Sequence, residues 1–485
     1  MLIAFAALAG FTPSVMRAVT MQVLIILSLQ LNREYDPPTA LAAAVIIMIA
    51  INPLVITSVS LQLSASCTIG ILLFAHRIHR YLLKNTPLGP AKGKSRKARF
   101  IRWFVSSISV SLSATIVTTP LCAYYFGMVS LVSVLTNLLT LWVVSFIFYG
   151  IMASGVAAAI WLPLGQILGW CISWPIRYVQ VVSKWLSQIP LAAIYTDNVY
   201  VVAWLIFAYV LFSVLMFQKK KRPFVFLGCI IVCLAVCLGL SALEKKSTNY
   251  SVTVLDVGQG QSVILKSGEE TYLVDCGGDS GGMVADTVRK TLLSDGIKKL
   301  DGLILTHYDS DHANGVLPLL EAVQVDRVYL PDIESDTDLR ERIMADCADK
   351  VVMVGEDMVL DLPDGKIQIF SAAQTRNEND NSLCILFQSG NCDILITGDR
   401  AFSGEMALME KVQLPKIEIL IAGHHGADSS TSLELLEVIQ PEDVVISVGR
   451  DNSFGHPTKA VLLRLWMFDC RVWRTDLNGT VRFRG

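Results

Sequence analysis

Long apolar runs fill the first half of the sequence, and they restrict its fold more than any other feature. A helix needs about 20 apolar residues to cross a bilayer core about 30 Å thick. Such runs predict a multi-pass α-helical membrane domain over residues 1–243. The predicted spans are Val15–Leu31, Leu41–Val59, Leu61–Ala75, Phe104–Tyr125, Leu131–Met152, Ala153–Trp174, Val201–Phe217 and Phe224–Leu243.

Basic residues are concentrated at two places in this half. The segment Arg77–Arg102 holds nine lysines and arginines and no acidic residue, and the second group is Lys219–Arg222. Because lysine and arginine are retained in cytoplasmic loops, both groups are expected inside the cell, and the four predicted spans between them agree with this. The last span then places the C-terminal part outside. Nucleic-acid binding by the basic loop is the alternative interpretation.

The segment Pro175–Pro190 is less apolar than its surroundings. Ile176, Val179 and Val182 recur at helical spacing between polar residues. An amphipathic helix along the outer membrane interface is predicted here.

Residues 244–485 have the character of a globular α/β domain. From Tyr250, short β-rich runs are separated by Gly and Asp turns, and a helical stretch follows over Val284–Ser294. Eleven cysteines in the whole chain form no CxxC pair, so neither a disulfide framework nor a cysteine metal site is expected.

One loop in this domain is dense in metal-binding side chains. Directly after the apolar run Leu303–Leu305 come His307, Asp309, Asp311 and His312. Imidazoles and carboxylates at this spacing, on a loop anchored by a buried strand, can surround one or two cations. Turn or helix-cap roles explain a single Asp but not this coincidence.

Further polar side chains follow three later apolar runs. ILITGDR supplies Asp399, ILIAGHHG supplies His424 and His425, and VVISVGRDNSFGHP supplies His456. Folding alone does not require this pattern, so we interpret these residues as functional.

These segments together resemble a known family. LDVGQGQS, LVDCGG, THYDSDH, LITGDR, HHGADSS and NSFGHP resemble the C-terminal domain of the ComEC family, and GFTPSVMRA and NPLVITSVSLQLS resemble its competence domain. The resemblance implies a metallo-β-lactamase-type α/β domain, an αββα sandwich, after the membrane domain. Family members carry further segments ahead of the one that begins here, so an N-terminally truncated chain is expected.

The ligand types and the resemblance together suggest roles for individual residues. His456 is expected to protonate the leaving oxygen and Asp311 to bind metal or orient the attacking water. The proposed metal ligands are His307, Asp309, Asp311, His312, Asp399 and His425. The proposed substrate contacts are His424, Asn452, Ser429 and Ser430.

Two departures from the superfamily pattern affect the metal site. Asp309 stands where the superfamily has His, as is usual in the ComEC branch, and no histidine lies between Ala313 and Gly398, where many relatives have a ligand. The set is therefore rich in oxygen, and one or two ions of zinc or manganese are expected.

The membrane half offers two polar residues inside predicted spans, Gln62 and Arg17. Both are channel candidates. Helix packing is the alternative for Gln62, and snorkelling from a helix end is the alternative for Arg17.

The resemblance implies DNA uptake in natural transformation, through a bacterial plasma-membrane channel for single-stranded DNA with an extracytoplasmic metal-dependent nuclease domain. The expected partners are DNA, the bilayer, a DNA receptor and an ATP-driven helper. A membrane-anchored hydrolase without transport, a transport protein whose outer domain binds DNA without cleaving it, and a decayed gene product are the alternatives.

Overall fold

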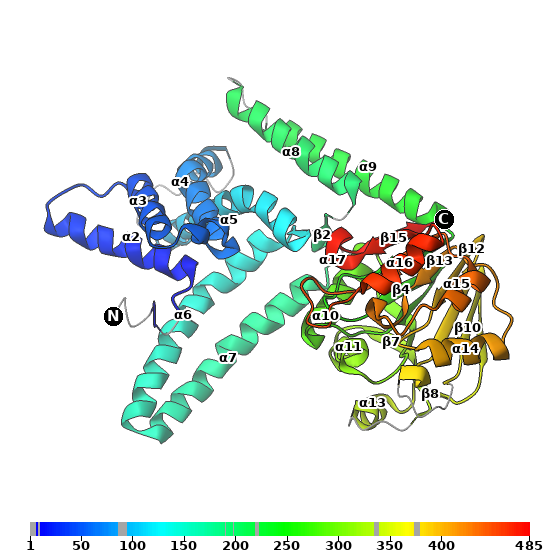
Figure 1. Cartoon of the computed structure of the whole chain (residues 1–485). Coiled ribbons are helices and arrows are strands. Elements are labelled where there is room, and N and C mark those ends of the chain that lie inside the picture. Colours follow the sequence, from blue (N-terminus) through cyan, green and yellow to red (C-terminus); the bar gives the residue numbers. More distant parts are fainter. Residues whose placement is uncertain are drawn as a thin grey trace. The chain divides into compact units, whose positions relative to one another are not determined.

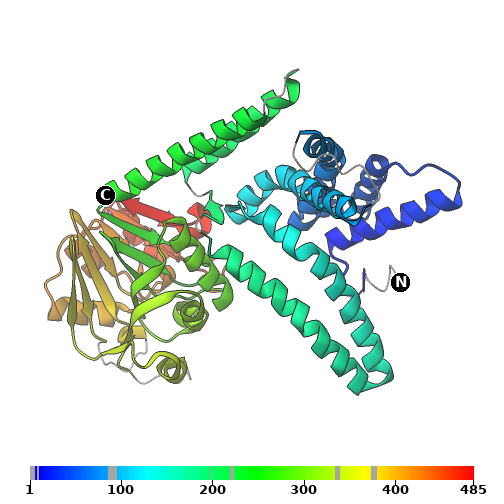
Figure 2. The same ribbon diagram turned by 180° about the vertical axis from the view of Figure 1, so that it is seen from behind.

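The computed structural model describes residues 6–7, 10–85, 95–189, 191–196, 198–218, 223–333, 339–372 and 379–485. Lys92, Lys94 and the basic group Lys219–Arg222 lie outside the described residues. The chain divides into two compact units, Met1–Leu238 and Gly239–Gly485. Figures 1 and 2 show helices throughout the first unit and sheets only in the second, apart from a short strand pair.

The first unit is built from long helices. These are α2 (Pro13–Gln30), α3 (Pro37–Ile51), α4 (Val59–Asn85), α5 (Arg96–Phe126), α6 (Ser133–Ile160), α7 (Leu162–Ser187), α8 (Val199–Phe217) and α9 (Pro223–Ser247), which continues into the second unit. A 3-10 turn follows α3 at Pro53–Thr57, and strands β1 (Met128–Ser130) and β2 (Ala193–Tyr195) pair antiparallel.

Five helices within the described residues are long and apolar enough to cross a bilayer. They lie at Pro13–Gln30, Val59–Lys84, Ala98–Phe126, Ser133–Ile160 and Val225–Glu244, and Pro37–Ile51 and Val199–Leu215 are shorter apolar helices. The first half is therefore a polytopic helical region of a membrane protein, as the apolar runs predict.

The predicted helix boundary at Met152/Ala153 is wrong. Helix α6 continues to Ile160, and Pro163 lies in the first turn of α7, where its missing N–H costs nothing. Pro175 does not end α7, and the amphipathic segment after it is the second half of that helix. Helices α6 and α7 pack along each other.

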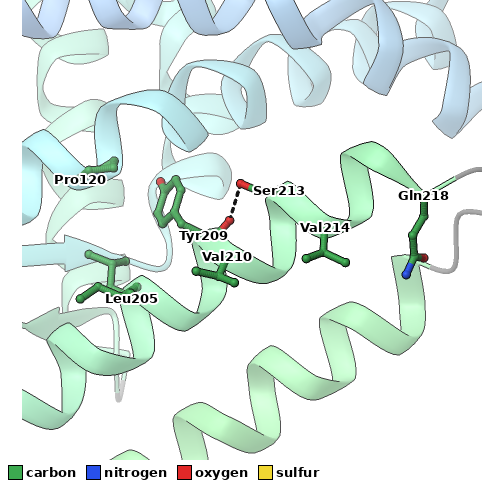
Figure 3. A pocket seen from close by; sticks show the side chains of 8 residues that line it. Pro120, Leu205, Tyr209, Val210, Ser213, Val214 and Gln218 are labelled. Atoms are coloured by element: carbon green, nitrogen blue, oxygen red, sulfur yellow. Dashed lines mark hydrogen bonds between the residues drawn. The ribbon is translucent and has the colours of Figure 1, made fainter.

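A tyrosine on α8 compensates for a proline in α5. Pro120 has no N–H to donate to the carbonyl four residues earlier, that of Ile116. The Tyr209 hydroxyl donates to this carbonyl instead. Figure 3 shows Tyr209 on the side of Pro120, in a pocket that Leu205, Val210 and Val214 also line.

The second unit contains two seven-stranded sheets. The first has the order β16-β3-β4-β5-β6-β7-β8 and the second has the order β15-β14-β13-β12-β11-β10-β9. The first comprises β3 (Tyr250–Val254), β4 (Val263–Ser267), β5 (Glu270–Val274), β6 (Lys299–Ile304), β7 (Gln324–Pro331), β8 (Val351–Val354) and β16 (Val481–Arg484). The second comprises β9 (Met358–Leu362), β10 (Gly365–Phe370), β11 (Cys384–Ser389), β12 (Cys392–Ile396), β13 (Ile419–Ile421), β14 (Asp443–Ile446) and β15 (Arg471–Arg474).

The sheets pack face to face, and helices cover their outer faces. On β12, Ile394 and Ile396 enter the core between the sheets, while Leu395 enters the core beneath the helices. Both faces of such a strand are buried, which explains its continuous apolar run. The covering helices are α10 (Gly281–Ser294), α12 (Val316–Ala322) and α13 (Leu339–Cys347) on the first sheet, and α14 (Phe402–Lys411), α15 (Leu433–Ile439) and α16 (Lys459–Met467) on the second. The predicted αββα sandwich is confirmed.

Replacing Tyr209 by Phe leaves the Ile116 carbonyl without the hydroxyl that compensates for Pro120. Interhelical hydrogen bonds in membrane proteins contribute about 0.6 kcal/mol on average. We therefore expect Tyr209→Phe to lower the Tm of the full-length protein in detergent by a small, reproducible amount. Tyr124→Phe, at an exposed ring of α5, is the control. Equal Tm values for both variants would contradict this role.

Candidate metal centre

The predicted site residues lie in loops at the carboxyl ends of parallel strands. Strands β5 and β6 run parallel, as do β12, β13 and β14. Asp275 follows β5, the His307–His312 loop follows β6, Asp399 follows β12 and the two adjacent histidines follow β13. The carboxyl ends of parallel strands meet at one edge of their own sheet, and the contacts of His312 with Asp399 and His425 show that these edges of the two sheets lie together.

Four of these residues form a compact cluster of potential metal ligands. Asp311, His312, Asp399 and His425 each offer one donor atom, and all four atoms lie within 4.8 Å of one another. His312 Nε2 is 3.0 Å from Asp399 Oδ1 and 3.2 Å from His425 Nε2, which in turn is 3.2 Å from Asp311 Oδ2. Three of the four residues are buried.

Each buried histidine is held through its Nδ1 atom. His312 Nδ1 is 2.8 Å from Asp275 Oδ2, and His425 Nδ1 is 2.9 Å from the Ser447 carbonyl. Because both partners are acceptors, Nδ1 carries the proton in each case and donates it. The Nε2 atoms then present lone pairs to the cluster, which is the tautomer that a metal ligand requires.

His307 is oriented in the same way. Its Nδ1 lies 3.0 Å from Thr306 Oγ1, whose own proton goes to Asp275 Oδ2 at 2.8 Å. The Thr306 oxygen therefore accepts from His307, and the Nε2 atom of His307 is left to face the site.

Asp275 is the centre of this arrangement, and the sequence analysis did not select it. Its fully buried carboxylate accepts hydrogen bonds from Thr306 N at 2.7 Å, Gln261 Nε2 at 2.9 Å, Thr306 Oγ1 and His312 Nδ1. The available signal was its position at the end of the strand in LVDCGG. A Cβ at Gly277 would stand 2.3 Å from the Asp311 carbonyl oxygen, so this glycine lets the metal-binding loop approach.

Asp399 lies between two groups of ligands. Its Oδ1 faces His312, while its Oδ2 is 3.9 Å from His307 Nε2 and 3.6 Å from His424 Nε2. Asp309 Oδ2 is 3.6 Å from His307 Nε2. Within the described part of the chain, His307 Nε2 and Asp399 Oδ1 are buried and make no hydrogen bond. Two buried atoms that can serve as metal ligands and make no hydrogen bond are consistent with a bound cation.

The electrostatics of the cluster also favour a cation. Burial lowers the pKa of His312, but the carboxylates of Asp399 and Asp275 outweigh this effect and hold the pKa well above its usual value. Burial raises the pKa of Asp311, but the hydrogen bond from His425 and the charges of both histidines bring it down to about 2. The carboxylates therefore favour positive charge in the cluster, and a cation bound at the Nε2 atoms would take the place of the second proton of these imidazoles.

His456 lies at the edge of the cluster. Its ring is 5.8 Å from the ring of His424, and its Nδ1 is buried without a hydrogen-bond partner among the described residues. Asn452 Nδ2 donates to the carbonyls of Gly449 and His456, and Asn452 Oδ1 accepts from His456 N. Asn452 therefore holds the loop that carries His456.

The two predicted serines differ in exposure. Ser430 is buried and its hydroxyl donates to the Arg400 carbonyl at 2.8 Å, whereas Ser429 is exposed. The Ser430 hydroxyl therefore holds the loop backbone, whereas the exposed Ser429 side chain can contact a ligand. Asp256 is exposed at a turn, where its Oδ1 lies 3.5 Å from Gly258 N.

Two further buried charges that the sequence analysis missed support the site loops. The Arg400 guanidinium donates to the Ser382 and Ser371 carbonyls, and the Ser382 hydroxyl accepts from Asp399 N. Glu405 accepts from Thr431 N at 2.6 Å and from Ser432 N at 2.9 Å, which fixes the loop after the histidine pair.

The two channel candidates of the first unit are both hydrogen-bonded between helices. Gln62 Oε1 accepts from the Tyr125 hydroxyl of α5, and Gln62 Nε2 donates to the Ile56 carbonyl. Arg17 Nε of α2 donates to Ser64 Oγ of α4 at 2.7 Å. Each residue therefore bridges neighbouring elements of this unit.

Comparisons with known families agree with this two-part architecture. Residues 1–222 match the family model described as Competence protein, and residues 255–450 match the one described as Metallo-beta-lactamase superfamily. The chain thus joins a competence-type membrane region to a metallo-β-lactamase fold. It shares both domains, in this order, with competence proteins of the ComEC family.

Two relatives align over nearly the whole chain. ComE operon protein 3 of Bacillus subtilis is 26% identical over 98% of this chain and 62% of the relative. Recombination protein 2 of Haemophilus influenzae is 28% identical over 99% of this chain and 61% of the relative. The chain thus spans about three fifths of the length of these two proteins. Among solved structures, the metallo-beta-lactamase fold protein YhfI from Bacillus subtilis is 14% identical, with a TM-score of 0.35, over 48% of this chain and 99% of that chain.

Asp275 can be tested as a residue that orients a ligand without contacting the ion. Loss of such a partner typically weakens metal binding about 10- to 100-fold. We expect Asp275→Asn to weaken binding of manganese or zinc to the metal-stripped full-length protein by this amount, measured by titration. Asp256→Asn, at the exposed turn, is the matched control. Equal affinities for the two variants, with the fold verified by circular dichroism, would contradict the role of Asp275.

Proposed function

We propose that the second unit is a metal-dependent phosphodiesterase that cleaves DNA, and that the first unit conducts the single-stranded product across the plasma membrane. The position of Asp399 between two ligand groups, with the Nε2 atoms of the buried histidines facing it, is the observation that carries this proposal. The similarity to competence proteins supplies the connection to DNA uptake.

In this proposal, the ligands divide into two groups around Asp399. His307 and Asp309 would hold one ion, Asp311 and His312 would hold a second, Asp399 would be shared between the two groups, and His425 would complete the ligand set. Manganese and zinc both suit this mixture of oxygen and nitrogen donors. Bound divalent ions would supply the Lewis acidity that activates water and offsets the charge of a phosphate.

The remaining roles belong to side chains around the cluster. Asp311 would alternatively orient the attacking water in place of binding an ion, while His424 and the exposed Ser429 would contact phosphate oxygens. His456 delivers a proton to the leaving oxygen. Burial and the neighbouring His424 and His425 lower the pKa of His456, so a phosphate anion beside the ring would have to raise this pKa for His456 to donate a proton near neutral pH. Asn452 and Ser430 act by holding the loops.

The proposal places the second unit outside the cell, and the distribution of basic residues supports this placement. Arg77, Arg80 and Lys84 on α4 and Arg96, Arg99 and Arg102 on α5 flank one connection, which we assign to the cytoplasm. An even number of crossings up to Lys219–Arg222 then directs α9 outward. A DNA receptor outside and an ATP-driven helper inside are the proposed partners.

Asp399→Ala provides the decisive test. Removing this carboxylate should reduce hydrolysis to the level of the metal-stripped protein, because Asp399 is the proposed ligand that both ions would share. The full-length protein in detergent is stripped of metal, reloaded with manganese or zinc, and assayed on single-stranded DNA, duplex DNA and a small phosphodiester. Asp361→Ala, at an exposed position of the edge strand β9, is the control and should retain activity.

Each alternative function has its own outcome in this assay. Hydrolysis of the small ester alone would favour an anchored hydrolase without transport. Metal and DNA binding without turnover would favour a non-catalytic outer domain. An Asp399→Ala variant as active as the control would reject the proposed site.

A further inference from the structure

An exposed phenylalanine lies in the loop that carries His456. Phe454 is 66% exposed, although it stands only two residues before His456. A single exposed phenyl ring is common at a protein surface and gains little from burial on folding. What distinguishes Phe454 is its position beside His456.

The ring is connected to the metal-binding cluster through two histidines. Phe454 and His456 stack with their ring centroids 5.8 Å apart and their planes 26° from parallel. The His456 ring is in turn 5.8 Å from that of His424, whose Nε2 reaches Asp399. Two ring-to-ring contacts thus lead from Phe454 to His424, and the Phe454 side chain stays mostly exposed while it stacks on His456.

The loop holds the ring in this position. Asn452 makes three hydrogen bonds to backbone groups at both ends of the loop, at Gly449 and His456. The ring therefore does not have to be ordered when a ligand arrives, and a preformed contact binds more tightly than one that must first be ordered.

We propose that Phe454 stacks an unpaired nucleobase of the nucleic acid whose phosphodiester lies at the metal-binding cluster. This proposal rests on the proposed phosphodiesterase function and adds its selectivity. Every base has an aromatic face, so stacking on an open ring is tolerant of sequence. In a duplex, each base already stacks on its neighbours, so the contact selects single-stranded or frayed segments.

Another partly exposed aromatic ring near the site, that of Phe402, is less available for stacking a base. Phe402 is 39% exposed, but the Arg464 guanidinium lies 5.2 Å from the centre of its ring. This cation already occupies one face and is held there by hydrogen bonds to the carbonyls of Asp428 and Ser430. Phe454 instead rests on an imidazole that is itself beside the cluster.

The test measures binding and hydrolysis by the metal-loaded full-length protein in detergent. Binding is followed by fluorescence anisotropy with a labelled single-stranded oligonucleotide, its duplex, and a strand of equal length made of abasic sites. Loss of one base–aromatic stack weakens binding about 5- to 150-fold. We expect Phe454→Ala to lose this factor on the single strand, Phe454→Trp to restore it, and neither variant to change binding of the abasic strand.

The matched control is Trp466→Ala, which removes an exposed aromatic ring at the far end of α16. It should bind all three ligands as the wild type does. Equal binding of the single strand by Phe454→Ala and wild type would overturn the proposal, and so would an equal loss on the abasic strand.

Hydrolysis separates this inference from the function on which it rests. If wild type binds the single strand through Phe454 but cleaves no phosphodiester with manganese or zinc, the stacking contact stands and the phosphodiesterase assignment fails. If wild type cleaves DNA and Phe454→Ala has the same KM and kcat on the single strand, the phosphodiesterase stands and the stacking contact fails.

Discussion

The buried carboxylate of Asp275 is the interaction on which the site depends. It accepts four hydrogen bonds, which link the end of β5 to the end of β6, to Gln261 and to His312. A buried carboxylate is costly unless its oxygens are satisfied, so this part of the chain can fold only with these partners in place. Once they are in place, the tautomers of His312 and His307 are decided, and their Nε2 atoms face Asp399.

The sandwich restricts where chemistry can occur. Strands such as β6 and β12 are apolar on both faces because each sheet lies between another sheet and a layer of helices. Polar side chains are therefore placed beyond the strand ends, where loops adopt unusual backbone conformations. Asp275, His424 and His425 all have φ between 50° and 58°, values that residues with a Cβ rarely adopt. Such conformations persist because surrounding hydrogen bonds, including those of Glu405 and Ser447, hold the loops.

Sequence periodicity predicted the architecture well because burial governs it. The apolar runs predicted the helical region and the α/β character of the second half, whereas the sandwich was predicted from the family resemblance. The clustering of His307, Asp309, Asp311 and His312 indicated a metal site. The predicted helix boundary after Met152 was wrong because α6, with 28 residues, is longer than the about 20 residues that a membrane span requires. Local propensity also does not show that α7 accommodates Pro163 in its first turn and Pro175 in its interior. Asp275 was not predicted because a single Asp shortly before two glycines is typical of a turn. Its hydrogen-bond partners also lie up to 37 residues away in the sequence.

Ser430 and Asn452 are not free to contact a substrate, and this affects how the site could distinguish one phosphodiester from another. The sequence suggested that both residues donate hydrogen bonds to phosphate, yet the hydrogen-bonding groups of both contact the loop backbone. What remains open beside the cluster in the described structure is His424, His456, Ser429 and the Phe454 ring. Histidines and a hydroxyl recognise phosphate in any diester, so they do not distinguish DNA from a small phosphoester. In our proposal the Phe454 ring supplies this discrimination, because it is the group that can recognise a base, and a site built in this way would prefer strands whose bases are free to stack.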